Sequence, residues 1–244
     1  RSPGAPALRA RPGEAVKRRA LWIAGLALLA APLLPPARPA VAVEDVGPVD
    51  LQELERERIA RAPLHPVRSR ISRYLEAATK AVDRGKPEEG RALLEKLDPK
   101  RLNPYERALV YRLQAHLAYF AGDYAAARER FEQVLAEEIL PVRDDNRIRF
   151  NIAQLYAASQ QWPEVITALD RWARYVEAQD SFAYYLRAVA HYQQDELDAA
   201  LADARQAVEL SSEPMESWLQ LLAALHSQKE DFASAIPILE QLVV

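Results

Sequence analysis

Small residues recur along this chain at a spacing that indicates a repeated structural unit. Five alanines are separated by 37, 38, 35 and 35 residues: Ala78, Ala115, Ala153, Ala188 and Ala223. Each is followed twelve residues later by a second small or β-branched residue: Gly90, Ala127, Val165, Ala200 and Ala235. The regular interval predicts a tandem array in which every unit has the same fold.

Each unit has the pattern of two short helices. Around the first small residue, apolar side chains recur with a 3.6-residue period, as in Tyr111, Ala115 and Ala118. Around the second, Ala127 and Phe131 continue the same period. A small side chain lets two helix backbones approach closely, while large residues one turn away fill the space beside the contact. The pattern therefore predicts helix-turn-helix hairpins.

The predicted turns contain residues suited to helix ends. Gly85 and Gly122 can end a helix in the left-handed conformation, and Asp123 and Asp231 can cap the next helix. Prolines follow the second helices, where a missing N–H group costs little: Pro99, Pro104, Pro141 and Pro214. We expect units of about 34 residues joined by short loops.

Residues 122–131 read Gly-Asp-Tyr-Ala-Ala-Ala-Arg-Glu-Arg-Phe, which resembles the turn and second helix of the tetratricopeptide repeat (TPR). The likeness covers roughly residues 71–244 and implies an all-α fold, a right-handed α-solenoid of about five TPR helix-turn-helix repeats. The repeats are expected to start near residues 71, 108, 146, 181 and 216. Because the apolar end of the chain is not a polar cap, we expect the natural protein to continue beyond Val244.

Four shorter segments resemble a narrower group of proteins. Residues 105–108, 151–156, 169–172 and 216–218 are similar to periplasmic TPR proteins encoded beside TonB–ExbB–ExbD energy-transduction genes. This resemblance implies an accessory role in TonB-dependent transport, with TonB, ExbB or ExbD as possible partners.

The first 42 residues differ in composition from the rest and are expected to form a leader with a signal peptide. Lys17, Arg18 and Arg19 precede the apolar run 20–31, and small residues at 40–42 suit a signal peptidase. The signal proper is expected at about 16–42, in either a long leader or an over-extended reading frame. A run this short favours cleavage over a stable membrane span and predicts a periplasmic protein of a Gram-negative bacterium. An uncleaved anchor is the alternative.

A linker or capping segment is expected at 43–70. Its stretch 51–61 mixes acidic and basic residues with Leu51, Leu54 and Ile59 spaced for one helical face. Two interpretations remain open: a solvated capping or linker helix, and a helix that docks to a partner.

Charge and cysteine content exclude several classes of protein. Beyond residue 42 the chain has 25 basic and 34 acidic residues, a formal charge of −9, whereas nucleic-acid binding needs clustered positive charge. The absence of cysteine excludes disulfides, thiolate metal sites and a lipid-modified N-terminal cysteine. Because of the negative charge, we expect no nucleic-acid partner.

No catalytic motif is present in the sequence. It contains no nucleophile elbow, phosphate-binding loop or zinc-binding helix signature. The histidines, of which His191 and His226 hold equivalent repeat positions, are expected to pack rather than bind metal. The adjacent acids at 137–138 and 144–145 are expected to be solvated caps and loop residues. We predict no enzyme activity, no metal and no cofactor.

The surface expected to bind is the concave one, which the first helices of successive repeats would line. Aromatic, arginine and amide side chains supply the anchors of peptide-binding surfaces. The inward-facing set is predicted to be Arg112, His116, Tyr119, Arg147, Phe150, Gln154, Phe182, Tyr185, Tyr192 and Gln220. The alternative is that several of these rings only pack between helices.

The leading functional hypothesis is a non-catalytic periplasmic scaffold that binds a peptide segment or another subunit, within a TonB-type transport system. A second hypothesis is an envelope assembly factor for outer-membrane proteins, pili or exopolysaccharide export. A third is the recognition arm of an enzyme whose catalytic domain lies beyond Val244. The repeats alone do not choose among these partners.

Overall fold

The computed structural model describes residues 49–61, 66–176, 178 and 180–242. These residues form eleven α-helices and one short 3₁₀ helix and contain no β-strand. The helices fall into two compact units, one within Ala40–Ser212 and one within Glu213–Val244, and each unit is described by itself. The predicted leader, with its signal at 16–42, lies outside the described residues.

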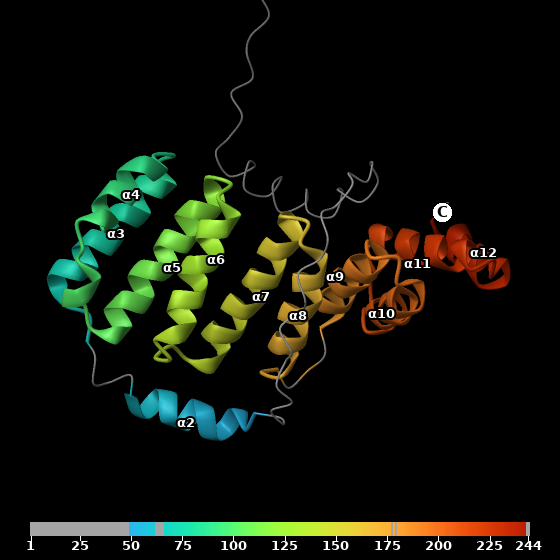
Figure 1. The fold of residues 1–244 in the computed structure, drawn as a ribbon, viewed down its shortest axis with the longest axis horizontal. Helices are drawn as coiled ribbons and strands as arrows, with labels where there is room; N and C mark the ends of the chain where they lie inside the picture. Colours follow the sequence, from blue (N-terminus) through green and yellow to red (C-terminus); the bar gives the residue numbers. More distant parts are fainter. Residues whose placement is uncertain (1–48, 62–65, 177, 179, 243–244) are drawn as a thin grey trace, which may run out of the picture. The chain divides into compact units, whose positions relative to one another are not determined.

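Four helix hairpins follow one another in the larger unit (Figure 1). They are α3 (Ser69–Asp83) with α4 (Pro87–Glu95), α5 (Pro104–Phe120) with α6 (Tyr124–Ala136), α7 (Val142–Ala158) with α8 (Trp162–Ala173), and α9 (Ser181–Tyr192) with α10 (Leu197–Glu209). The 3₁₀ helix η3 (Pro99–Arg101) joins the first two hairpins. The second helix of each of the first three hairpins also packs on the first helix of the next, which is the arrangement of a solenoid.

The recurring small residues are buried between helices, and at one of them two helix backbones approach closely. All five alanines of the first helices are buried, and so are the five residues twelve positions later. At Gly90, an added Cβ would come within 3.1 Å of the Ala78 carbonyl oxygen. The α3 and α4 backbones therefore meet at this point without room for an ordinary side chain.

Larger side chains complete the core on either side of these contacts. Phe131 on α6 packs with Ile148 and Ile152 on α7. Leu169 on α8 packs in the same way with Leu186 on α9. Each of these hairpins thus shares a core with the hairpin that follows it, which gives the unit its linear order.

One position in every turn adopts the left-handed conformation. Gly85 and Gly122 have φ of 76° and 79°, as predicted. The equivalent residues of the next three repeats are not glycine, yet Gln160, Asp195 and Glu230 have φ of 57°, 62° and 60°. The left-handed turn is therefore imposed by the packing of the two helices and not by the presence of glycine. In three repeats it places a residue with a side chain at positive φ, which is a strained conformation.

Helix caps follow the predicted aspartates. The Asp123 carboxylate accepts from the amide of Ala126 and the Asp231 carboxylate from that of Ser234. Asn103 and Glu106 form a capping box at the start of α5, in which each side chain accepts from the other residue's backbone amide. These caps satisfy amides that the first turn of a helix leaves unpaired.

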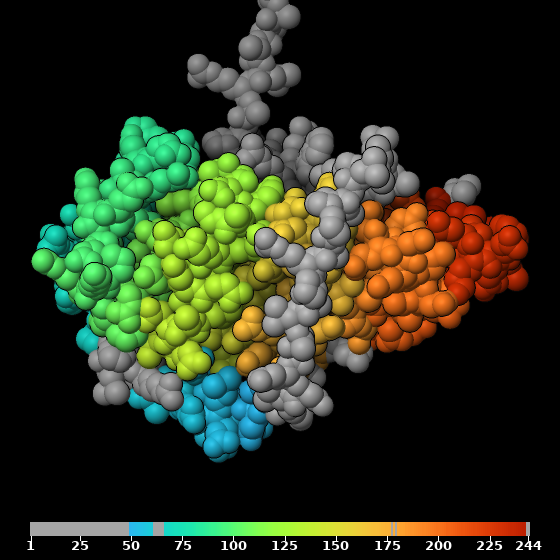
Figure 2. All heavy atoms as spheres, in the orientation of Figure 1, coloured from blue at the N-terminus to red at the C-terminus, as the bar shows by residue number. Residues whose placement is uncertain are grey.

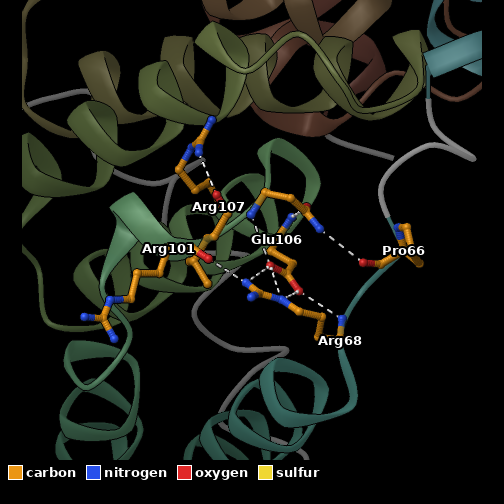
Figure 3. Close-up of polar contacts among 7 residues, drawn as sticks. Pro66, Arg68, Arg101, Glu106 and Arg107 are labelled. Atoms are coloured by element: carbon orange, nitrogen blue, oxygen red, sulfur yellow. Dashed lines mark hydrogen bonds and ion pairs between the residues drawn. The ribbon is translucent and has the colours of Figure 1, made fainter.

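A buried carboxylate ties the beginning of α3 to α5 (Figure 3). Glu106 is fully buried and accepts from the Arg68 amide at 2.9 Å and from its guanidinium at 2.6–3.2 Å. Arg68 also donates to the Arg101 carbonyl, and Asn103 donates to the Pro66 carbonyl. The segment that leads into the first hairpin is therefore fixed against the second.

The helix α2 (Leu51–Arg61) docks on the start of α7. In Figure 2 its atoms (blue) form a ridge along the lower edge of this unit. The Arg58 guanidinium lies 3.3 Å from the Asp145 carboxylate, and these residues are only 4% and 2% exposed. The Val142 amide donates to Glu55 at 2.7 Å.

One expectation for these segments needs correction. The prediction that the acids at 144–145 are both solvated is wrong for Asp145, because α2 covers it and pairs it with Arg58. The docking partner of α2 is α7 of the same chain, 87 residues away at the Glu55–Val142 contact. Sequence periodicity cannot reveal such a long-range contact, because it reports only local structure.

The smaller unit is one hairpin, α11 (Glu216–Gln228) with α12 (Phe232–Gln241). Trp218, Leu222 and Leu225 of α11 are buried. The His226 ring lies 2.8 Å from the Asp231 carboxylate, which joins the first helix to the turn. His226 was expected to pack rather than bind metal, and it is buried, with only 3% of its surface exposed.

No helix within the described ranges is long and apolar enough to cross a membrane.

Candidate protein-interaction surface

The first helices α5, α7 and α9 carry nine of the ten side chains predicted to bind, and α11 carries the tenth, Gln220. The structure brings several of them together in two aromatic groups. One group lies between α7, α8 and α9, and the other lies at the end of α5 and the start of α6. The two groups differ in how much ring surface they expose.

The first group consists of rings that pack mainly between helices. Phe150 lies 5.2 Å from Trp172 and 6.0 Å from Phe182, measured between ring centroids. Phe182 in turn lies 6.1 Å from Tyr185, which is only 7% exposed. Phe150 and Phe182 are half-buried, so they offer a ligand only the outer part of each ring.

The second group is the more accessible. Tyr119 is 36% exposed and the next residue, Phe120, is 50% exposed. Their rings meet edge to face at 5.6 Å, and Tyr119 lies 6.1 Å from Tyr124 across the turn. Exposed rings with two rotatable bonds give large contact area at low entropic cost, which suits them as binding anchors.

Phe120 was not among the residues predicted from the sequence. The predicted set contains Arg112, His116 and Tyr119, near Ala115, and stops before the last residue of α5. The sequence signal that could have found it is an aromatic residue just before the turn glycine Gly122, where the helix ends. The exposed Phe120 ring adds apolar surface beside Tyr119.

Arg112 and His116 lie on the same helix face as Tyr119. The His116 ring contacts Phe131 edge to face at 5.5 Å, while the residue keeps an exposed side. Loss of water against this contact lowers the pKa of His116 below its ordinary value, and the nearby Arg112 charge lowers it further. At neutral pH His116 is therefore an uncharged ring, and the positive charge of this face belongs to Arg112.

The other predicted residues occupy separate places. Arg147 is exposed on α7, and Gln154 and Tyr192 are half-buried on α7 and α9. Gln220 donates to Glu216 at 2.7 Å within its own helix, and it belongs to the smaller unit. The two aromatic groups are built without these four residues.

Two half-buried arginines of this unit, Arg187 and Arg107, are engaged in structural contacts. Arg187 makes two bonds to Asp203, at 2.7 and 2.8 Å, and one to Asp170 at 3.0 Å. These carboxylates raise the pKa of Arg187 above its ordinary value. Arg107 pairs similarly with Glu137, which was expected to be a solvated loop residue. Each pair connects helices or loops, so its groups are committed to holding the fold.

Histidine and carboxylate side chains do not cluster as metal ligands would. His191 lies 2.6 Å from Glu196 and 3.7 Å from Asp203. In the part of the chain that the structure describes, no three His, Cys, Asp or Glu side chains form a group that could hold a metal ion. The His191–Glu196 contact has the same sequence spacing as the His226–Asp231 contact of the next repeat, which is the pattern of a structural element.

One segment of the chain matches a known protein family. Residues 183–214, which hold most of α9 and all of α10, match the model of the tetratricopeptide repeat. The chain contains a tetratricopeptide repeat. This TPR hairpin has the same left-handed turn position as the hairpins before it, and its contact residues Ala188 and Ala200 are buried like their equivalents. No curated protein matches the sequence at a significant level.

Solved TPR-like structures resemble the greater part of this chain. MamA residues 41 to the end from Desulfovibrio magneticus RS-1 superpose with a TM-score of 0.60 at 19% identity, over 73% of this chain and 96% of that one. A kinesin light chain from Podosopora anserina, with nearly identical TPR-like repeats, gives 0.53 at 21% identity, over 71% and 93%. The prediction of an all-α TPR solenoid is therefore confirmed.

Proposed function

We propose that this protein is a non-catalytic scaffold that binds a segment of another protein along its first helices. The observation that carries the proposal is the pair of exposed rings at the end of α5, Tyr119 and Phe120, on the helix that also carries the Arg112 charge. Aromatic and arginine side chains are the residue types that dominate binding energy at protein interfaces. A rigid array of packed hairpins holds such anchors in place before binding and so lowers the entropic cost.

The finer proposal is an accessory role in TonB-dependent transport, in the periplasm. It is supported by the four short segments that resemble TonB-associated TPR proteins. The basic residues 17–19 before the apolar run 20–31 support export. The lack of cysteine is compatible with an oxidising compartment, because a large helical core needs no disulfide.

Affinity capture of the tagged full-length protein from detergent-solubilised native membranes tests both levels of the proposal. A Tyr119→Ala/Phe120→Ala variant is expected to lose the captured partner. Phe232→Ala is the matched control, because Phe232 is 58% exposed on α12 and belongs to the smaller unit. Capture of TonB, ExbB or ExbD would support the transport role. Partner capture that survives the double substitution would exclude this surface as the binding site.

A further inference from the structure

A groove of about 770 Å³ lies between α2, the first turns of α7 and the segment after α8. It is separate from the surface at the end of α5, and all its lining residues belong to the larger unit. One face of α2 forms a wall, with residues such as Leu51, Glu55 and Ile59 at one-turn spacing. The volume is within the range of about 300–1,000 Å³ that is common for ligand sites.

Part of the groove lining is apolar. Val142 and Trp172 line it, and Ile59 on α2 is 61% exposed. The Arg149 guanidinium stacks on the Tyr175 ring at 3.8 Å, and Asn146 donates to the Tyr175 carbonyl. The wall opposite α2 is therefore fixed, while the apolar surface of Ile59 remains available for a ligand.

The charges that line the groove are unequally engaged. Both carboxylates are occupied by backbone amides, because Glu55 accepts from Val142 at 2.7 Å and Asp180 accepts from Ala183 at 2.8 Å. Arg56 on α2 and Arg143 on α7 are exposed and have no ion-pair partner among the described residues. The lining contains two carboxylates and two guanidinium groups, so its formal charges balance, but only the guanidinium groups, one on each of two opposite walls, remain available to pair with a ligand.

We propose that this groove binds a short acidic peptide segment with an apolar centre. The apolar side chains would contact Ile59, Val142 and Trp172, and the flanking carboxylates would pair with Arg56 and Arg143. The exposed Gln52 side chain also lines the groove and can hydrogen-bond to a peptide backbone. A groove open along α2 suits a peptide, whereas a fatty acid would favour an enclosed cavity.

The buried Arg58–Asp145 pair gives the groove its rigidity. It holds α2 on α7 from the side of α2 opposite to solvent, at 3.3 Å and out of contact with water. Neither Arg58 nor Asp145 lines the groove, so a ligand does not need to disrupt them. The wall that carries Arg56 is thus positioned independently of the ligand.

Fluorescence anisotropy with the full 244-residue chain tests the proposal. The probes are three labelled peptides with glutamate flanks around Leu-Leu, Phe-Leu or Trp-Leu, and the same peptides with lysine flanks. At least one acidic peptide is expected to bind saturably. Because two charge pairs would be lost, Arg56→Gln/Arg143→Gln is expected to weaken that binding about tenfold or more, and Ile59→Ser about threefold.

Two control variants show whether binding depends on this groove. Arg73→Gln/Arg84→Gln removes two exposed arginines elsewhere and should leave the affinity unchanged, as should Tyr119→Ala/Phe120→Ala. The proposal is overturned if no acidic peptide binds, if lysine-flanked peptides bind equally, or if the control substitutions weaken binding as much. Binding of dodecanoate without any peptide, or self-association that depends on Arg56 and Arg143, would also overturn it.

Discussion

The Glu106 carboxylate accepts both the backbone amide and the guanidinium of Arg68, across 38 residues of sequence (Figure 3). The bonds from Arg68 lower the pKa of Glu106 to about 2, against the opposing effect of burial. Because Glu106 also completes the capping box of α5, one carboxylate secures both the start of that helix and the segment before α3.

Glu106→Gln is expected to lower the free energy of unfolding by about 2 kcal/mol, because it removes charge-assisted hydrogen bonds from a buried acceptor. The folded-state pKa of Glu106 is depressed, so its contribution is present above the ordinary carboxyl pKa and is lost as pH falls toward about 2. Urea titrations from neutral pH down into the acid range should show the difference between wild type and variant shrinking. Glu89→Gln, which breaks only an exposed pair with Lys86, should change little.

Arg58→Met is expected to undock α2, because it leaves Asp145 buried and charged without its partner. Loss of one member of a buried pair typically costs about 3–5 kcal/mol. Arg58→Met/Asp145→Leu should recover most of the docking, since two apolar side chains of similar size can replace a buried ion pair. Hydrogen exchange of the α2 amides measures how well α2 is docked in each variant. If these amides are as unprotected in the double variant as in Arg58→Met, the buried pair is not what holds α2 in place.

The docking of α2 should become weaker as pH rises, whereas the stability contributed by Glu106 becomes weaker as pH falls. Burial raises the pKa of Asp145 to about 6, despite the charges of Arg58 and Arg149, with Asp144 and Glu138 adding to the rise. A raised carboxyl pKa gives stability that is present at low pH and lost as pH rises through about 6. Protection of the α2 amides against exchange should therefore decrease as pH rises through about 6. In Asp145→Asn, which has no carboxyl group to titrate, this protection should not change over the same pH range.

Gln160→Gly is expected to stabilise the protein by up to about 1 kcal/mol. Gln160 has φ of 57°, a conformation that costs roughly 1–2 kcal/mol for a residue with a side chain, partly offset by the backbone entropy of glycine. The midpoint of thermal unfolding should rise. Gln194→Gly, in the turn between α9 and α10 but with φ below zero, should not raise it.

Much of the repeat architecture was predictable because it depends on local patterns. The contact alanines, the turn glycines and the capping aspartates each report on structure within a few residues. The left-handed residues at Gln160, Asp195 and Glu230 were not predictable from residue type. They follow only from the repeat register that makes them equivalent to Gly85 and Gly122.

The binding residues were less predictable from the sequence than the repeat architecture. Helix geometry places Tyr119 and Tyr185 about one turn from their alanines, yet Tyr185 is buried and Tyr119 is exposed. The difference arises from packing between helices, as where Phe150 of α7 meets Phe182 of α9, which a single repeat does not specify. The groove beside α2 was missed for the same reason, because its walls are 87 residues apart at Glu55 and Val142.

The docking of α2 on α7 also constrains the order of folding. Hairpin contacts between α3 and α10 join neighbours in sequence and can form quickly, whereas α2 must close a loop that contains two complete hairpins. The start of α7 must exist before Arg58 can be buried against it. The segment 51–61 is therefore expected to reach its place last, after the hairpins between it and its partner have formed.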